Sequence, residues 1–133
     1  MSDELVRVAK AAQESAYAPY SNFHVGAAIE SEDGRIFSGC NVENASYGLT
    51  ICAERAAVGV AISSGVRRIT KVVVVTDANP PSAPCGGCRQ VLAEFGDDIE
   101  IVAVGPGGSR SWNITDLLPD KFGRRDLESK GSN

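Results

Sequence analysis

The stretch Lys71-Val72-Val73-Val74-Val75-Thr76 decides the fold of this chain. Its apolar residues do not alternate with polar ones, which is typical of a β-strand that is buried on both faces. A strand of this kind lies inside a sheet that helices cover. Because helices and strands alternate in the sequence around it, we predict an α/β protein in which the central part of the sheet is parallel.

Apolar spacing and turn residues predict the remaining elements. Before the central strand we expect a helix over 3–16 capped by Ser2 or Asp3, a hairpin of strands 25–30 and 35–41 around a turn at 32–34, and a helix over 52–64 with Thr50 as a possible cap and Gly65 as its stop. After it we expect a helix over 85–95, strands over 100–104 and 110–114, a short helix over 115–118 and a polar tail from about residue 128. The sequence contains no repeat or linker, so residues 1–133 are predicted to form a single domain.

The composition of the chain limits the kinds of molecule that we expect it to bind. The chain has 43% apolar and 23% charged residues, as soluble globular domains do, and a net charge of −4 with scattered lysines and arginines. This charge argues against binding nucleic acid and favours a small, nearly neutral substrate. Because no stretch has the length and apolarity of a signal peptide or a membrane span, we expect a cytoplasmic protein without a membrane partner.

Two short motifs carry the chemistry: Cys52-Ala53-Glu54 and Pro84-Cys85-Gly86-Gly87-Cys88. Together they form the signature of zinc-dependent nucleobase deaminases. Cys85 and Cys88 are three residues apart, so they share one face of a helical first turn, and Cys52 supplies the third thiolate. Three protein ligands leave one position on zinc for water, which indicates a catalytic site rather than a structural one.

The residues beside the ligands have predicted roles of their own. Glu54 is close enough in sequence to the metal to take a proton from water and return it to a ring nitrogen. Arg55 and Arg89 each follow a motif directly and can donate hydrogen bonds to sulfur, which offsets the negative charge of three thiolates. Of the two arginines, we favour Arg55 for this role.

Other interpretations of the cysteines are less well supported by the sequence than a catalytic zinc site. A redox dithiol needs neither a third cysteine nor an adjacent glutamate, and a pair of disulfides belongs to small secreted domains. A structural site of four thiolates that recruits Cys40 stays open at this point, as does a zinc-stabilised scaffold without catalysis. Retention of Glu54 argues against such a scaffold, because a structural site has no use for the carboxylate.

From about Tyr17 to Leu127 the chain resembles the small cytidine deaminases of the tetrameric, three-cysteine type. The matching stretches are Ala18-Pro19-Tyr20-Ser21-Asn22-Phe23, Val25-Gly26-Ala27-Ala28, Gly39-Cys40-Asn41-Val42-Glu43-Asn44-Ala45, Cys52-Ala53-Glu54-Arg55, Pro84-Cys85-Gly86-Gly87-Cys88-Arg89-Gln90 and Leu117-Leu118-Pro119. The resemblance implies a three-layer α/β/α fold with a mixed five-stranded sheet and one zinc ion per subunit. It also implies a homotetramer with its active sites at subunit interfaces.

The same resemblance assigns the substrate. It implies zinc-dependent hydrolysis of cytidine and 2'-deoxycytidine to uridine and 2'-deoxyuridine, with release of ammonia. Asn41 and Glu43 resemble the pair that binds the ribose hydroxyls, Phe23 the aromatic residue that packs against the base, and Phe122 the aromatic residue that reaches a neighbouring subunit's pocket. The backbone around Ala53 and Cys85 is expected to contact the pyrimidine edge and the water.

Two positions depart from the family's pattern. His24 stands beside Phe23 where proline is common, and Arg124-Arg125 stands where some relatives have Pro-Glu. The segment His24 to Ala28 also resembles deaminases of cytosine-nucleoside antibiotics of the blasticidin S type, which makes such an antibiotic the alternative substrate. That group lacks the combination of Phe23 with Asn-Val-Glu-Asn. A polynucleotide-editing deaminase fits less well, because the charge is acidic and the first ligand is a cysteine.

Overall fold

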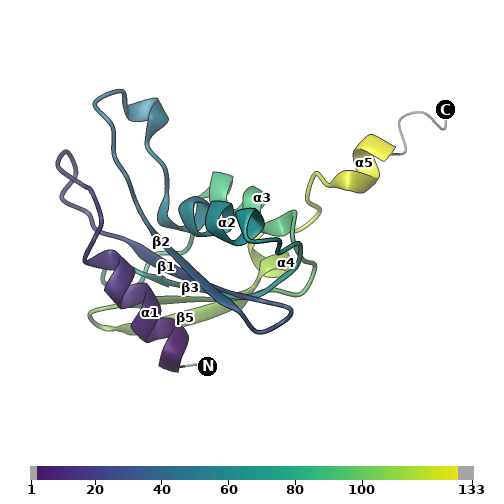
Figure 1. Cartoon of the computed structure of the whole chain (residues 1–133), viewed down its shortest axis with the longest axis horizontal. Helices are drawn as coiled ribbons and strands as arrows, with labels where there is room; N and C mark the ends of the chain where they lie inside the picture. Colours follow the sequence, from purple (N-terminus) through teal and green to yellow (C-terminus); the bar gives the residue numbers. More distant parts are fainter. Residues whose placement is uncertain (1–2, 129–133) are drawn as a thin grey trace.

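A computed structural model describes residues 3–128, which form a three-layer α/β/α domain around one five-stranded sheet (Figure 1). In chain order the elements are α1 (Asp3–Gln13), β1 (Gly26–Ser31), β2 (Ile36–Cys40), the 3-10 helix η1 (Tyr47–Leu49), α2 (Ala53–Ser63), β3 (Ile69–Val75), α3 (Gly86–Ala93), β4 (Glu100–Gly105), β5 (Gly108–Asn113), α4 (Ile114–Leu117) and α5 (Arg124–Glu128). Helix α1 covers one face of the sheet, and α2, α3 and α4 lie on the other.

The sheet is mixed, as predicted, with the strand order β2-β1-β3-β4-β5. Only β3 and β4 run parallel, with Val73 opposite Val102, because a helical crossover joins them. The three other neighbouring pairs are antiparallel. The parallel part predicted for the centre of the sheet is therefore a single pair of strands.

Strand β3 contributes to two separate apolar clusters, as its unbroken apolar sequence predicts. Val72 and Val74 pack into the cluster beneath α2 and α3. Val73 and Val75 point to the other face, where they pack with Leu5 of α1. The side chains of a strand alternate between the two faces of a sheet, so one strand fills both cores only when every position is apolar.

Two glycines let the helices approach the sheet closely. A Cβ atom at Gly26 would lie 2.0 Å from the backbone oxygen of Ala9 in α1. A Cβ atom at Gly39 would lie 2.6 Å from the backbone nitrogen of Ala57 in α2. No side chain fits at either distance, so these glycines fix how α1 and α2 sit on β1 and β2.

Several predicted boundaries are wrong by two or three residues. Helix α1 ends at Gln13 rather than at residue 16, because the next residues form tight turns and the N–H of Tyr17 bonds to Asn41 instead. Strand β3 begins two residues early, at Ile69, because a register shift that leaves Thr70 of β3 without a partner in β1 lets the pairing continue. Strand β5 begins at Gly108, since its hairpin with β4 closes tightly.

The predicted helix caps are only partly correct. The residue that caps α2 is Cys52 and not Thr50. The helix ends at Ser63 with Ser64 as its C-cap, and the predicted stop Gly65 follows with a φ of +96°, which suits glycine. The proposed cap Ser2 lies outside the described residues. Helix α5 was not predicted, and residues 129–133 of the predicted polar tail also lie outside the described part.

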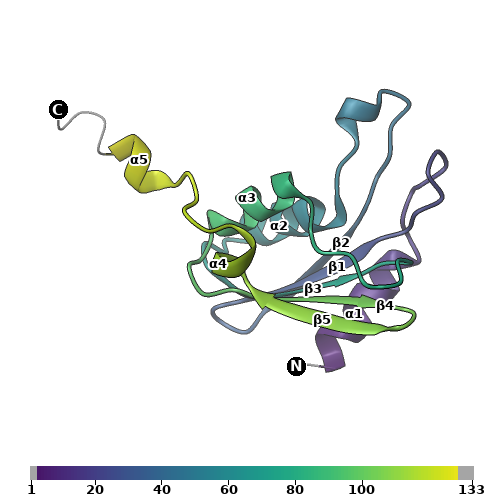
Figure 2. The same ribbon diagram turned by 180° about the vertical axis from the view of Figure 1, so that it is seen from behind.

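Two long excursions, residues 14–25 and 41–52, project side by side from one end of the sheet (Figure 1, upper left). Helix α5 projects from the opposite side of the domain (Figure 2). Large apolar side chains on the excursions are exposed, among them Tyr47 at 73% and Leu49 at 67%. Within residues 3–128, no helix is long and apolar enough to cross a membrane.

Candidate active site

The starts of α2 and α3 bring three sulfur atoms together. Cys52 and Cys85 are the N-cap residues of these two helices, and Cys88 lies in the first turn of α3, fully buried. The three Sγ atoms all lie within 4.8 Å of one another, and the Sγ atoms of Cys52 and Cys85 are 4.0 Å apart. Both helices start at the same end of the sheet, which places the residues of the two motifs side by side.

The donor set fits a zinc ion. Three sulfurs in a tetrahedral zinc site, with Zn–S bonds of about 2.3 Å, are separated by about 3.8 Å, close to the spacing seen here. All four cysteines of the chain are free, which excludes the disulfide alternative in this structure. Cys40 lies at the end of β2 and does not join the cluster among the described residues. The four-thiolate alternative is therefore wrong for this structure.

The environment of the cluster favours a thiolate at Cys52. Hydrogen bonds from Cys88 above all, and then from Arg55 and Cys85, lower the pKa of the Cys52 thiol to about 5. The bond to Cys52 and burial raise the pKa of Cys88. The start of a helix adds partial positive charge at both N-caps, which also stabilises a thiolate. A bound cation takes the place of the proton that these sulfurs otherwise share.

The two arginines make different contacts. The guanidinium of Arg55 donates to the backbone oxygen of Thr50 at 3.2 Å and to Sγ of Cys52 at 3.9 Å. Arg89 donates instead to the backbone oxygens of Pro84 and Leu117, at 2.8 and 3.1 Å. Arg55 is thus the arginine that contacts a sulfur, whereas Arg89 ties the loop before Cys85 to α4.

Glu54 is a buried acid next to the cluster. It lies in the first turn of α2, its residue is 5% exposed, and it lines a cavity together with Cys52 and Cys85. Burial is the main cause that raises the pKa of the Glu54 carboxyl, and the nearby Cys52 adds to the shift. A carboxyl group in such a place can hold a proton and pass it to a bound ligand.

The cavity beside the three sulfurs has a volume of about 220 Å³. It is lined by Phe23, Val25, Asn41, Thr50, Cys52, Ala53, Glu54, Val74, Thr76, Ser82, Ala83 and Cys85. Three residues that were predicted to bind substrate, namely Phe23, Asn41 and Ala53, are therefore brought together with the predicted ligands. The cavity is mostly apolar with a few polar groups, which suits a small aromatic ring.

Glu43 lies in a second hollow of about 300 Å³, which it lines with Tyr20, Ser21, Tyr47 and Thr50. Thr50 lines both hollows, so they are neighbours. The Glu43 carboxylate accepts hydrogen bonds from the N–H groups of Tyr20 and Ser21 and from the hydroxyl of Ser21. The Ser21 hydroxyl is the main cause that lowers the pKa of Glu43.

The side chain of Asn41 is buried and is bonded to protein. Its Oδ1 accepts from the N–H of Val25 at 2.9 Å, and its Nδ2 donates to the backbone oxygen of Phe23 at 2.8 Å. A side-chain amide has four hydrogen-bonding positions, and the two bonds leave one donor and one acceptor position. Asn41 therefore shapes the cavity wall and retains some capacity for a ligand.

Known proteins match both the sequence and the fold. The family model described as "Cytidine and deoxycytidylate deaminase zinc-binding region" matches residues 1–105. The chain belongs to this family. It is 45% identical over 127 residues to a cytidine deaminase of Sporosarcina psychrophila, covering 94% of this chain and 93% of the relative. A cytidine deaminase of Mycobacterium tuberculosis is 49% identical over 112 residues, covering 84% and 82% of the two chains.

Solved structures of cytidine deaminases agree with the fold. The crystal structure of the Burkholderia pseudomallei cytidine deaminase has a TM-score of 0.87 and 50% identity, covering 92% of this chain and all of the other. The Bacillus anthracis cytidine deaminase, at 19% identity, keeps the same fold with a TM-score of 0.71. The predicted cytidine-deaminase-like fold is therefore confirmed, and the zinc-binding region of the family contains the three cysteines of this chain.

In this family member, Phe122 does not line the cavity of its own chain. It is 60% exposed, its backbone oxygen accepts a bond from Gln90 at 2.7 Å, and it lines a hollow that also includes Lys121 and residues of α5. The predicted contact of Phe122 with a neighbouring subunit stays a prediction.

Four serine and threonine residues that line the two hollows were not predicted as site residues: Ser21, Thr50, Thr76 and Ser82. Ser21 stands inside a motif that matched the family, so its position was a usable signal. Thr50 was interpreted as a helix cap because it precedes an alanine-rich stretch. Thr76 and Ser82 carry no local pattern, and only the fold brings them to the cavity.

Proposed function

We propose that the chain hydrolyses cytidine and 2'-deoxycytidine to uridine and 2'-deoxyuridine, releasing ammonia. The observation that supports this most directly is the shared cavity, which is lined by Cys52 and Cys85 of the sulfur cluster and by the buried Glu54. The relatives named cytidine deaminase support the choice of reaction and substrate.

The reaction needs a nucleophile, a proton carrier and a place for the ring. Cys52, Cys85 and Cys88 would hold zinc, and zinc in such a site supplies an activated water for attack on C4 of the cytosine ring. The chain's own contribution is Glu54, which takes a proton from the attacking water and donates it to ring nitrogen N3. Glu54 then passes the proton of the new C4 hydroxyl group to the exocyclic amine, the C4–N bond breaks, and ammonia leaves as C4 becomes the carbonyl of uridine.

Substrate recognition follows from the two neighbouring hollows. In this proposal the pyrimidine ring occupies the cavity between Phe23 and Ala53, next to the sulfurs. The ribose extends toward Asn41 and Glu43, whose free acceptor and donor positions suit hydroxyl groups. The backbone around Cys85 contacts the edge of the ring. The positive charge of Arg55, whose guanidinium contacts Sγ of Cys52, offsets the negative charge of that thiolate.

We further propose a homotetramer in which Phe122 enters a neighbouring subunit's site. The exposed apolar side chains on the two excursions support burial against another subunit, since single chains seldom leave such patches in water. Phe122 lines a hollow with residues of α5 and not the cavity beside the sulfurs. Measuring the mass in solution tests the assembly, and a monomer at working concentration contradicts it.

The decisive experiment is an absorbance assay with cytidine, 2'-deoxycytidine and blasticidin S side by side, with and without a zinc chelator. We expect turnover of both nucleosides, loss of turnover with the chelator and recovery when zinc is added back. Turnover of the antibiotic alone would replace the proposed substrate. Activity that survives complete removal of zinc would contradict the proposed role of the cysteines.

A further inference from the structure

The backbone of residues 23–25, here called the Phe23 segment, is bonded almost entirely by side chains. The N–H of Phe23 donates to Oγ of Ser21, and its carbonyl accepts from Asn41. The N–H of Val25 donates to Asn41, and the carbonyl of Val25 accepts from the N–H of Asn41. Because the segment precedes β1 and lies outside the strand pairing, its position depends on these bonds.

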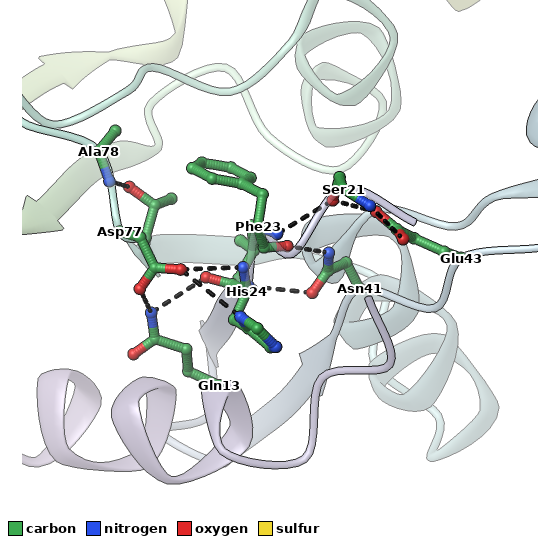
Figure 3. Close-up of polar contacts among 10 residues, drawn as sticks. Gln13, Ser21, Phe23, His24, Asn41, Glu43, Asp77 and Ala78 are labelled. Atoms are coloured by element: carbon green, nitrogen blue, oxygen red, sulfur yellow. Dashed lines mark hydrogen bonds and ion pairs between the residues drawn. The ribbon is translucent and has the colours of Figure 1, made fainter. Parts of the chain in front are cut away.

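The residue between them, His24, is held from the other side by Gln13 and Asp77 (Figure 3). The N–H of His24 donates to Oδ2 of Asp77 at 3.1 Å, and its carbonyl accepts from Nε2 of Gln13 at 3.0 Å. Gln13 also donates to Oδ1 of Asp77 at 3.2 Å. The imidazole Nδ1 of His24 lies 3.6 Å from Oδ2 of Asp77, so the ring points to the carboxylate. Asp77 and Gln13 thus form one clip around the peptide groups of His24.

One part of this clip lies at the end of a helix, and the other lies just after a strand. Gln13 is the last residue of α1, and α1 lies so close to Gly26 that a Cβ atom there would be 2.5 Å from the backbone nitrogen of Gln13. Asp77 follows β3, between Thr76, whose N–H bonds to Val104, and Ala78, whose N–H bonds to the Thr76 hydroxyl. The segment is therefore fixed to α1 and to the end of the central strand.

Phe23 lines the same cavity as Cys52 and Cys85 of the sulfur cluster. A shift of the His24 peptide groups carries Phe23 with it, because the two residues share a peptide bond. Gln13 and Asp77 do not line the cavity, so their effect on a ligand must pass through the segment. Residue 24 also needs an N–H for the bond to Asp77, which proline does not have.

We propose that Gln13 and Asp77 are positioning residues that hold Phe23 against the base and so set the affinity for the nucleoside. The inference rests on the proposed function for its choice of ligand. It adds two residues from α1 and from the loop after β3 to a site otherwise built from the helix starts and the two excursions. Loss of the clip frees the segment and weakens substrate binding, while the sulfur cluster and Glu54 keep their places.

The kinetic test uses Asp77→Ala, Gln13→Ala and the conservative Asp77→Asn, with Glu14→Ala as the control. Glu14 is exposed and next to Gln13 but takes no part in the clip. We expect Asp77→Ala to raise KM for cytidine about 10-fold and Gln13→Ala about 5-fold, with kcat within about 2-fold of the parent. Asp77→Asn keeps an oxygen acceptor and should restore most of the affinity. The control should match the parent in KM.

A double-mutant cycle with Phe23→Ala separates positioning from general stability. If Asp77 acts through Phe23, adding Asp77→Ala to Phe23→Ala should change KM by no more than about 2-fold. An Asp77→Ala effect of equal size with and without the phenylalanine overturns the proposal. So does an unchanged KM in both Asp77→Ala and Gln13→Ala, or a fall in kcat alone.

A second measurement does not depend on turnover. Amide hydrogen exchange of the peptide that covers residues 18–30 should be faster in Asp77→Ala and Gln13→Ala than in the parent and in Glu14→Ala. Unchanged exchange overturns the proposal even when KM changes. If the parent protein does not deaminate cytidine, the proposed function fails, and the exchange result still decides whether the clip holds the segment. Should Asp77→Ala not fold, Asp77→Asn and Gln13→Ala carry both measurements.

Discussion

The sulfur cluster and the Phe23 segment lie on the same cavity but are held in different ways. The cluster is placed by the first turns of two helices, so residues adjacent to Cys52 and Cys85 in sequence are also adjacent to them in space. The Phe23 segment is held by side chains that are far away in sequence, such as Asp77, which is 53 residues from His24. Under the two proposals above, the helix starts hold the reactive groups, and the long-range bonds position the residue that contacts the substrate.

We expect substitutions in the two regions to change different kinetic constants. Changes in the cluster should lower kcat or remove zinc, with smaller effects on KM. Changes around the segment should raise KM or lower stability and leave zinc in place. A substitution in the Phe23 segment that abolishes zinc binding would contradict this difference between the two regions.

The largest expected effect is that of Cys88→Ala. Removing the buried ligand leaves two thiolates, which hold zinc far more weakly than three, so the purified variant should lack zinc and measurable activity. Elemental analysis of metal content and the cytidine assay check this. Cys40→Ala is the matched control, because Cys40 lies outside the cluster, and it should retain both zinc and turnover. Equal zinc content in Cys88→Ala and the parent contradicts the assignment.

Glu54→Ala should come next, with kcat lower by at least about 1,000-fold because the proton carrier is lost. Zinc content should stay at the parent level, since the three sulfurs are untouched. Stability should not fall, because the substitution removes a buried acid whose burial is unfavourable to its charged form. Steady-state kinetics, metal analysis and a thermal melt on the same sample test all three points. Ammonia release at a rate comparable to the parent would show that Glu54 is not the proton carrier.

Asn41→Ala should lower the stability of the protein and also raise KM, because Asn41 holds the Phe23 segment in place. The substitution leaves the N–H of Val25 and the carbonyl of Phe23 without their partner, at a cost of about 2–4 kcal/mol in the free energy of unfolding. KM should rise as well, because Phe23 loses one of its fixed neighbours. Urea unfolding and kinetics measure both quantities. Asn44→Ala is the control, since Asn44 is exposed and its side chain accepts a bond from the nearby N–H of Ser46, and its cost should stay below about 1 kcal/mol.

The smallest effect is expected from the pair His24→Pro and His24→Ala. His24→Ala keeps the N–H that donates to Asp77, so KM should stay within about 2-fold of the parent. His24→Pro removes this donor and should raise KM by about 3- to 5-fold. Comparing the KM values of the two variants separates the contribution of the backbone N–H bond from that of the imidazole ring. A larger effect of His24→Ala than of His24→Pro would assign the contact to the ring instead.

The sequence alone predicts the features that depend on local pattern. The apolar stretch 71–76 predicted the doubly buried strand, and the two cysteine motifs predicted the cluster, because helix periodicity and helix starts act over only a few residues. The predicted cap at Thr50 was wrong because a threonine before an alanine-rich stretch looks like a cap whatever its tertiary contacts are. Cys52 takes that position, since its backbone leads directly into the first turn.

The clip of Gln13 and Asp77 could not be predicted, because it depends on contacts between residues far apart in the sequence. Gln13 and Asp77 are 64 residues apart, and neither stands in a motif. Gln13 was predicted to lie inside a helix that continues to residue 16, and Asp77 falls between the predicted strand 71–76 and the predicted helix 85–95. Only the packing of α1 on Gly26 and the end of β3 beside it bring the two side chains to one peptide group.

The alternation along β3 has a consequence for how the chain tolerates changes in length. Inserting or deleting one residue within Val72–Val75 would exchange the two sets of valines between the faces and shift Asp77 away from His24. The same shift would pull on the loop that leads to Cys85. Homologues should therefore vary in length in the exposed loops, such as the turn at 32–34, and keep the number of residues in β3 constant.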